Sequence, residues 1–582
     1  MSIDAISRQK RKATGAETGR PVIAGVNHMV SAGHYLAATA AFEILEAGGN
    51  AIDAGVAGGI ALAVVQSELV NFAGVAPIIV RMGATGETKS IAGLGWWPRA
   101  MTPSYFMDNH GGEIPHGLAR TVVPAAPDAW ITALARFGTM SFGEVARAAI
   151  RLARDGFVMY PLMAELIATF EEEYSRWPSS SAVYLPNGRP PQVGEKFVQA
   201  DLARTMQYMV DEEATRASEG REAGLMAARD AFYRGDIART IDTFHRENGG
   251  FLTLDDMAGY SSEVEDTLSV DFGGVKVHGC GAWCQGPSML QIFSMLEASG
   301  IADLPHNSPE YVHRFTEIIK LAFADRHAYV GDPRFVDVPV ERLLSKAHAE
   351  ARLRRIDPDR SILGLPVDGG YADPAVPVDP RIRTEATPPS LDTSYIAVVD
   401  RWGNSFSATP SDVTYDTPII PGTGVAPSSR GSQSWADPRH PSSVAPGKRP
   451  RLTPSPALAV GADGRLVPFG TPGGDVQAQA MAQVLTNLLV FRMSPQRAVE
   501  APRFASYSFP DSFEPHDFYP NRLHLETGVG EAVGEALTAR GHDVNWWPDL
   551  TWRAGSVCLV DYAQGLYAGA ADPRRPCYAL GW

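Results

Sequence analysis

Apolar residues recur at helical spacing in several stretches of the chain, and two of these stretches follow one another near the N-terminus. Residues 36–45 place apolar side chains on one helical face and precede the glycine pair at 48–49, which supplies the positive backbone φ used at helix ends. Asn50 is a typical N-cap, so a second helix is expected at residues 51–65. This second stretch is apolar on almost every face and is therefore expected to be buried. Further helices are expected at residues 144–154, 310–329 and 476–493.

A strand pattern replaces the helical one at residues 394–399, where β-branched and aromatic residues predict a buried strand. Residues 400–404 contain Asp, Gly and Asn and predict a turn, and residues 405–409 alternate as the returning strand of a hairpin. Strands that come as hairpins and helices that come in blocks favour stacked α/β layers over a singly wound parallel sheet. Other strands are expected at residues 76–81, 466–470 and 556–560.

Thr393 lies directly before this hairpin, at the end of a proline-rich connector. Residues 365–390 contain six prolines, which exclude a helix or a central strand there. A threonine freed at such a junction would carry, in its own α-amine, the base that a hydroxyl nucleophile needs. A lone threonine in this position usually does no more than open a strand. The interpretation of Thr393 as a nucleophile therefore needs a second feature.

That second feature is a glycine-rich turn at residues 470–475, between an expected strand and an expected helix. The amides of Gly473 and Gly474 would lie near a helix N-terminus, where backbone donors and the helix dipole stabilise a developing oxyanion. Such a turn is common without any function. The chain lacks an H-E-x-x-H sequence, a Walker loop and a G-x-S-x-G sequence, and no metal-ligand spacing stands out. Together, Thr393 and the glycine turn therefore indicate half of an acyl-transfer site.

Composition narrows the class of partner. The chain has 582 residues, more than one hydrophobic core usually holds, with 45% apolar and 20% charged residues as in ordinary globular proteins. Its formal net charge of −15 argues against nucleic acid or an anionic membrane as partner. Residues 1–20 are basic and polar without an apolar core, so no secretion signal is expected. Four cysteines are too few for a disulfide scaffold, and a cytoplasmic location is expected.

At this point an ordered set of motifs resembles the γ-glutamyltransferases, from about residue 22 to residue 582. The resemblance implies an N-terminal-nucleophile hydrolase with a four-layer αββα fold, made as one precursor that cuts itself between Asp392 and Thr393. It implies a flexible N-terminus at 1–21, a large chain at 22–392 that ends in a linker at 365–392, and a small catalytic chain at 393–582. The matching motifs are residues 46–54, 232–235, 254–260, 324–326, 392–393, 398–400, 403–404, 421–424, 447–450, 471–475, 500–504 and 570–575.

The chain departs from this family where the family holds the α-amine and α-carboxylate of a γ-glutamyl group. The family uses an arginine, an asparagine, an aspartate and a pair of serines for this purpose. Burying those charges without partners would cost several kcal/mol, so a different acyl group is expected. Trp96 and Trp97 suggest a more apolar or planar group, and Arg430 could still hold a carboxylate. The positions concerned are here residues 93–98, Val413, Gln433 and the pair Leu452 and Thr453.

The Arg-Gly pattern at Arg430, with Asp392 before Thr393, is similar to the branch of the family that includes oxamate amidohydrolase. By this resemblance Thr393 Oγ attacks a small amide, its α-amine moves the proton, and Ser411 hydrogen-bonds the nucleophile. No metal or organic cofactor is expected, and the partners are the amide substrate and the two associated chains, with a homo-oligomer of the processed pair left open. Three alternatives remain: a true γ-glutamyl transferase or glutathione hydrolase, a cephalosporin-acylase-like enzyme, and an unprocessed binding relative.

Overall fold

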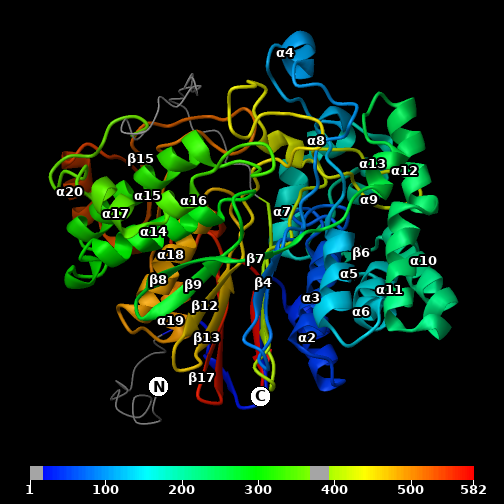
Figure 1. The fold of residues 1–582 in the computed structure, drawn as a ribbon, viewed down its shortest axis with the longest axis horizontal. Helices are drawn as coiled ribbons and strands as arrows, with labels where there is room; N and C mark the ends of the chain where they lie inside the picture. The colour runs from blue at the N-terminus through cyan, green and yellow to red at the C-terminus, as the bar shows by residue number, and fades with distance from the viewer. Residues whose placement is uncertain (1–17, 367–391) are drawn as a thin grey trace.

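The computed structural model describes residues 18–366 and 392–582, so residues 1–17 and nearly all of the expected linker at 365–392 lie outside the described residues. Two seven-stranded sheets stand face to face in the middle of the molecule, and helices cover the outer face of each (Figure 1). This is the expected four-layer αββα arrangement. Neighbouring strands within both sheets run antiparallel.

The first sheet contains the expected hairpin at its centre. Its strand order is β19 (Tyr578–Gly581), β2 (Met29–Ala32), β10 (Ile396–Val399), β11 (Ser405–Ala408), β3 (Ile78–Arg81), β4 (Thr88–Ile91) and β7 (Val264–Asp266). The second sheet has the order β1 (Ile23–Gly25), β18 (Leu566–Ala571), β17 (Cys558–Ala563), β13 (Leu466–Gly470), β12 (Ala457–Gly461), β9 (Val275–Gly279) and β8 (Leu268–Phe272). Smaller sheets are formed by β14 (Phe504–Ser506), β15 (Arg522–Glu526) and β16 (Asp543–Trp547), and by β5 (Phe157–Val158) and β6 (Lys196–Phe197).

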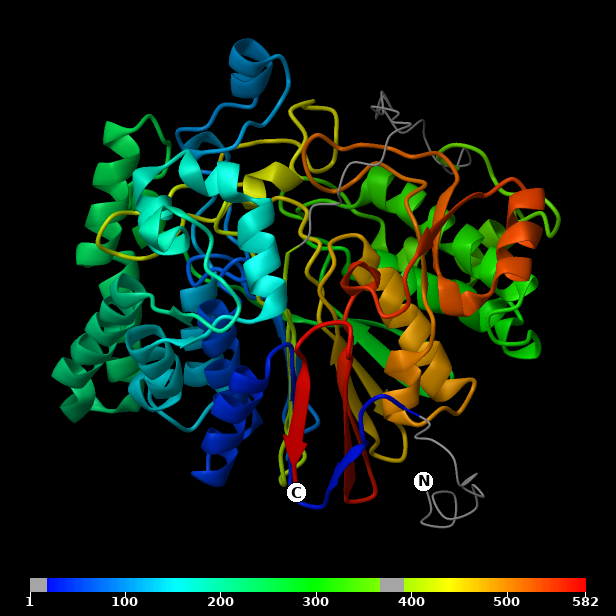
Figure 2. The same ribbon diagram turned by 180° about the vertical axis from the view of Figure 1, so that it is seen from behind.

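Each sheet has its own helical layer, and the view from behind shows the two layers on opposite sides (Figure 2). The first layer and its surroundings contain α2 (Tyr35–Glu46), α3 (Ala51–Val65), α4 (Tyr105–His110), α5 (Ala126–Phe137), α6 (Phe142–Asp155), α7 (Pro161–Thr169), α8 (Glu171–Ser175), α9 (Pro178–Tyr184), α10 (Ala200–Arg216), α11 (Arg221–Tyr233), α12 (Asp236–Glu247) and α13 (Leu254–Ala258). The second contains α14 (Gly286–Ala298), α15 (Pro309–Tyr329), α16 (Val340–Leu343), α17 (Lys346–Leu353), α18 (Val476–Leu489), α19 (Pro495–Glu500) and α20 (Glu531–Ala539).

Helix α3 is the buried helix that the sequence predicts, and it packs against the β10–β11 hairpin. Asn50 caps it through a reciprocal capping box with Asp53, which satisfies backbone N–H groups that the helix itself cannot. A Cβ atom on Gly55 would lie 2.1 Å from the Phe406 ring, and one on Gly58 would lie 2.2 Å from the Ile396 side chain. These two glycines therefore allow the helix to pack closely on β10 and β11.

Strand β10 alternates between two cores. Ile396 and Val398 face the helical layer, whereas Tyr395, Ala397 and Val399 belong to the apolar cluster between the two sheets. The Tyr395 hydroxyl, buried there, hydrogen-bonds to the Ser407 hydroxyl at 2.6 Å on the neighbouring strand. Tyr395, the residue before this strand, is thus held by packing between the sheets and by this hydrogen bond, and it lies two positions after Thr393.

Most expected elements are confirmed, with shifts at their ends. The strand of the hairpin begins at Ile396 instead of residue 394, and α18 ends at Leu489, short of the expected residue 493. The late strand, β17, begins at Cys558. In the described part of the chain, none of the helices is long and apolar enough to cross a membrane. The four cysteines are free and buried.

Candidate active site

Thr393 is held in an unusual backbone conformation at the entrance to β10. Its φ is 86°, a region that a β-branched residue adopts only when its surroundings enforce it. Its N–H donates to the Leu69 carbonyl at 2.9 Å, and its carbonyl accepts from Arg575 Nη1 at 3.1 Å. The whole residue is buried. Both backbone groups of Thr393 are therefore tied to distant parts of the chain.

The hydroxyl of Thr393 lies in a dense polar network. It donates to Asp392 Oδ1 at 2.7 Å and lies 2.5 Å from the Ser411 hydroxyl. Ser411 Oγ in turn donates to Asp392 Oδ2 at 3.1 Å. The Arg430 guanidinium donates through Nη2 to both Asp392 and Ser411. The structure thus brings together four residues that the sequence analysis singled out separately.

Ser411 and Arg430 are positioned by rigid loops beyond the hairpin. Ser411 forms a two-way backbone bridge with Val75, with N–H to O distances of 3.0 and 3.2 Å. Next to it, Asp412 has a φ of 111° and accepts hydrogen bonds from both Ser428 and Ser429, the residues that lead into Arg430. Burial raises the pKa of Asp412 to about 6. Arg430 then opens a short 3₁₀ turn, Arg430–Gln433, and is itself buried.

The glycine turn lies where the sequence places it, between β13 and α18. Gly473 and Gly474 have φ values of 123° and 55°, in the region of positive φ that favours glycine. Asp475 holds the turn in place, because it forms an ion pair with Arg326 and accepts a hydrogen bond from the Ser512 amide at 2.8 Å. The turn is therefore rigid, as an oxyanion site requires.

Gln433 and Thr453, two of the expected substrate-binding residues, hydrogen-bond each other. Gln433 Nε2 donates to Thr453 Oγ1 at 2.8 Å, and the Thr453 amide donates to Gln433 Oε1 at 3.3 Å. The amide of Gln285 joins this pair to the glycine turn, because its Nε2 donates to the carbonyls of Thr453 and Gly474 at 2.6 and 3.2 Å. Gln285 lies outside the motifs that match the family, so the sequence did not predict its place here.

The apolar replacements are integrated into cores. Val413 is buried in the cluster beneath the first helical layer, and Leu452 is buried with Trp283 in a separate cluster. Trp97 is buried and donates from Nε1 to Ser434 Oγ at 3.0 Å. Trp96 packs on the Tyr260 ring with centroids 4.8 Å apart. Both tryptophans thus pack against other residues of the protein, and their role in acyl binding stays a prediction.

Two further ionisable groups lie near the backbone of Thr393, and they were not predicted from the sequence. Glu68 is buried one residue before the Leu69 carbonyl, and burial raises its pKa to about 8. The Tyr160 hydroxyl donates to its Oε1 at 3.2 Å. Arg575 donates to the Thr393 carbonyl from the other side. It is the last residue of the family motif at 570–575, and this motif was the one feature of the sequence that could have pointed to it.

A cleft of about 430 Å³ lies on the Arg430 side of this network. Ser432 and Phe513 are among its lining residues, and the Phe513 ring centre lies 5.6 Å from the guanidinium carbon of Arg430. The rest of the wall combines aromatic side chains, including Tyr415 and Tyr507, with charged ones such as Asp511 and Arg522. The cleft is suited to an organic group with apolar surface.

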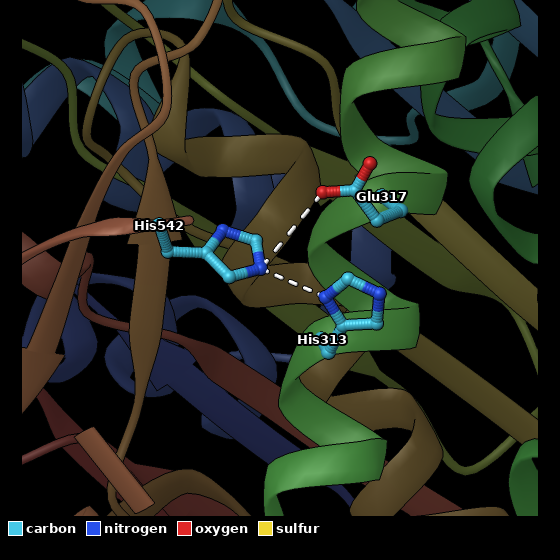
Figure 3. A group of neighbouring side chains, drawn as sticks. All are labelled: His313, Glu317 and His542. Carbon is cyan, nitrogen blue, oxygen red and sulfur yellow. Dashed lines mark hydrogen bonds and ion pairs between the residues drawn. The ribbon is translucent and has the colours of Figure 1, made fainter. Parts of the chain in front are cut away.

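His313, Glu317 and His542 form the one cluster of metal-ligand type found among the described residues, on α15 and just before β16 (Figure 3). Its donor atoms already have partners. His313 Nδ1 and His542 Nε2 lie 2.8 Å apart, and Lys320 Nζ donates to Glu317 Oε1 at 2.7 Å. An ammonium group on the same carboxylate oxygen opposes a second cation there. The donor set does not fit a metal ion, and instead joins residues 357–362 to α15.

The chain is similar to known proteins along most of its length. The chain matches the family described as gamma-glutamyltranspeptidase over residues 37–582. It is 32% identical over 564 residues to the Acylase ACY 1 proenzyme of Pseudomonas sp. (strain SE83), covering 94% of this chain and 92% of that protein. It is 29% identical over 572 residues to the oxamate amidohydrolase proenzyme of Klebsiella pneumoniae, covering 95% and 98%.

Two solved structures match nearly the whole chain. The structure titled LmbA2991T421A has a TM-score of 0.89 and 32% identity, with 97% of this chain and 100% of that chain covered. A cephalosporin acylase from Bacillus halodurans has a TM-score of 0.83 and 27% identity, with 98% of each chain covered.

Proposed function

Because the chain belongs to the γ-glutamyltranspeptidase family and is thus an amide hydrolase or acyltransferase, we propose that it is a proenzyme that cleaves itself between Asp392 and Thr393. The freed Thr393 then hydrolyses a small amide that is not a standard γ-glutamyl compound. The observation that carries this proposal is the buried hydroxyl of Thr393, held between the Asp392 carboxylate and the Ser411 hydroxyl.

The contacts of that hydroxyl with Asp392 and Ser411 support self-cleavage at the peptide bond between Asp392 and Thr393. Thr393 Oγ forms a bond to the Asp392 carbonyl carbon, the carbon–nitrogen bond breaks, and the hydroxyl proton passes to the departing nitrogen. Water then hydrolyses the resulting ester, which leaves a carboxylate on Asp392 and a free α-amine on Thr393. The positive φ of Thr393 is a strained backbone conformation, and cleavage removes the Asp392 carbonyl carbon that defines this angle, so the cut releases the strain.

Amide hydrolysis uses the same atom with the new amine as the base. Thr393 Oγ attacks the substrate carbonyl, the α-amine takes the hydroxyl proton and delivers it to the departing amine, and the acyl group stays on Oγ as an ester. The Gly473 and Gly474 amides stabilise the oxyanion, and Ser411 orients the nucleophile. Water, deprotonated by the α-amine, releases the acid. The other reactants in this scheme are substrate and water, so it requires no metal.

The experiment that tests this proposal is the mass of the purified chains. Wild-type protein should yield two chains, and the smaller should begin at Thr393 by intact mass. The variant Thr393→Ala should remain a single inactive chain, whereas Thr393→Ser, which keeps a hydroxyl, should still cleave. Wild-type protein that stays intact and yet hydrolyses amides would overturn the mechanism. An intact wild type without activity would favour a binding relative instead.

A cephalosporin-acylase-like activity is the second candidate. Its support is the apolar character of Val413 and Leu452 together with the similarity to acylases. A γ-glutamyl activity is disfavoured, because the polar ligands that the family has at positions 413 and 452 are replaced here by apolar side chains, which cannot pair with its charged head group. A cytoplasmic location is part of the proposal, and subcellular fractionation tests it.

A further inference from the structure

We infer that Glu68 is a positioning residue of the mature site, and that its buried carboxylate is the counter-ion of the α-ammonium group that self-cleavage leaves on Thr393. This inference rests on the proposed function and adds a residue to its proton chemistry. It derives from the position of Glu68 in the chain, because the carbonyl of the next residue, Leu69, accepts the Thr393 N–H at 2.9 Å. The nitrogen that becomes the α-amine is therefore held by the segment that carries Glu68.

The Glu68 carboxyl group is buried and has one unused oxygen atom. Only 1% of the residue is exposed. Its Oε1 atom accepts from the Tyr160 hydroxyl at 3.2 Å, and its Oε2 atom has no hydrogen-bond partner among the described residues. A carboxyl group buried in this way keeps its proton more firmly, and burial raises the pKa of Glu68 to about 8. The precursor therefore stores a proton next to the residue that binds the Thr393 amide.

The groups that surround Glu68 include one cation. Arg575, which follows β18, interacts electrostatically with Glu68 and donates from Nη1 to the Thr393 carbonyl at 3.1 Å. Its positive charge disfavours a second cation on Thr393. His34 packs on the Tyr160 ring and stays neutral, because burial lowers its pKa to about 3. Burial also raises the pKa of three tyrosines that interact with Glu68, and these are Tyr160 before α7, Tyr174 on α8 and Tyr184 on α9.

Self-cleavage turns a neutral amide nitrogen into an amine in this buried place. Near neutral pH an α-amine is protonated, and a buried ammonium group without a counter-ion is costly. Two other carboxylates close to Thr393, those of Asp392 and Asp412, lie beside the Arg430 guanidinium instead. Glu68 adjoins the residue that binds the Thr393 nitrogen, so its proton passes to that nitrogen. The transfer gives a carboxylate and an ammonium ion and needs no other reactant.

This ion pair sets the pH at which the nucleophile becomes active. Burial and the charge of Arg575 lower the pKa of the Thr393 amine, whereas the Glu68 carboxylate raises it. The amine must lose its proton before it can accept one from the hydroxyl. Removing the carboxylate should therefore move the pH profile of kcat/KM toward lower pH.

The test is the pH dependence of kcat/KM for hydrolysis of a 4-nitroanilide of a small acid by the mature enzyme. In Glu68→Gln the midpoint of this profile should lie about one pH unit or more below that of the wild type. A midpoint that does not move would overturn the inference even if the rate falls, because the loss of a purely structural contact lowers kcat/KM at every pH alike.

Glu213→Gln is the matched control. Glu213 is also a buried glutamate whose pKa is raised by burial, but its carboxylate accepts hydrogen bonds from the Phe142 and Gly143 amides, both at 2.7 Å, at the start of α6. Its replacement should leave the midpoint at the wild-type value. An equal shift in both variants would overturn the assignment to Glu68.

A second measurement decides if Glu68→Gln does not fold or does not cleave itself. At pH 7, Thr393→Ala keeps the peptide bond and should show the infrared C=O stretch of a protonated carboxyl group that mature wild type lacks. The same band in both proteins would overturn the inference, because Glu68 would then have kept its proton. Wild type that does not cleave itself would instead refute the proposed function.

Discussion

Replacing Glu68 by Gln should stabilise the protein in a way that grows with pH. Glu68 is fully buried beside the residue whose carbonyl binds the Thr393 amide, and its Oε2 atom has no hydrogen-bond partner among the described residues. Burial disfavours the charged form and raises the pKa of Glu68 from 4.5 to about 8. Glutamine has the same shape and can still accept from the Tyr160 hydroxyl, but it never ionises.

The size of the effect follows from linkage. A carboxyl whose pKa is higher in the folded chain stabilises folding fully below pH 4.5, and this stabilisation is lost as the pH rises to about 8. The free energy lost across that range is about 5 kcal/mol. Because the entropy of unfolding grows with chain length, each kcal/mol corresponds to about 1 °C in a chain of this size.

The assay is thermal unfolding between pH 5 and pH 9 in the Thr393→Ala background, which should keep both proteins as single chains. The Tm of Glu68→Gln minus that of its parent should be near zero at pH 5 and should reach about 4 °C at pH 9. The exposed Glu172→Gln serves as control and should show no such trend. A Tm difference that is independent of pH would refute the reasoning, since a lost contact acts equally at every pH.

Three other outcomes are expected. The kcat/KM for amide hydrolysis should rise with pH through one ionisation near 7.7 to 8.0, because a free α-amine titrates in this range and must be neutral to accept a proton. EDTA should leave kcat/KM unchanged. A kcat/KM that falls over this pH range would exclude the amine as base. The double variant Val413→Asn and Gln433→Asp should shift kcat/KM toward γ-glutamyl-4-nitroanilide; an unchanged preference would show that these positions do not contact the substrate. Gly55→Ala should lower the yield of folded protein, because its Cβ would meet the Phe406 ring, and a normal yield with unchanged Tm would contradict that packing.

The local structure could be predicted from the sequence wherever neighbouring residues determine it. The capping of α3 by Asn50 and the β10–β11 hairpin follow from residues within a few positions of one another, and both are confirmed. The ends of the elements differ from the predicted ones because packing determines them. Strand β10, for example, begins at Ile396 and not at residue 394, since Thr393 just before it is held at positive φ.

The contacts around Thr393 could be predicted only in part. Ser411 and Arg430 were named from motif positions, but their convergence on Asp392 depends on loops that the hairpin and β3 hold in place. Leu69 and Arg575 contact Thr393 although they are distant in sequence, and Arg575 lies 182 residues from it. The pairing of His313 with His542 depends likewise on the packing of α15 against the β16 region. No local pattern carries such information.

The strand order has a consequence for what a cut at Thr393 would do to the molecule. Strands from before and after this residue alternate in both sheets: β10 lies against β2, β11 lies against β3, and β13 and β12 continue into β9 and β8. Neither piece could leave without tearing two sheets apart. The pieces would therefore not exchange between molecules faster than the whole protein unfolds, and mixing two isotopically labelled preparations should yield no hybrids. Because both pieces contribute strands to both sheets, neither piece has a complete sheet on which to fold alone. The two pieces therefore need to be made as one chain, from one gene.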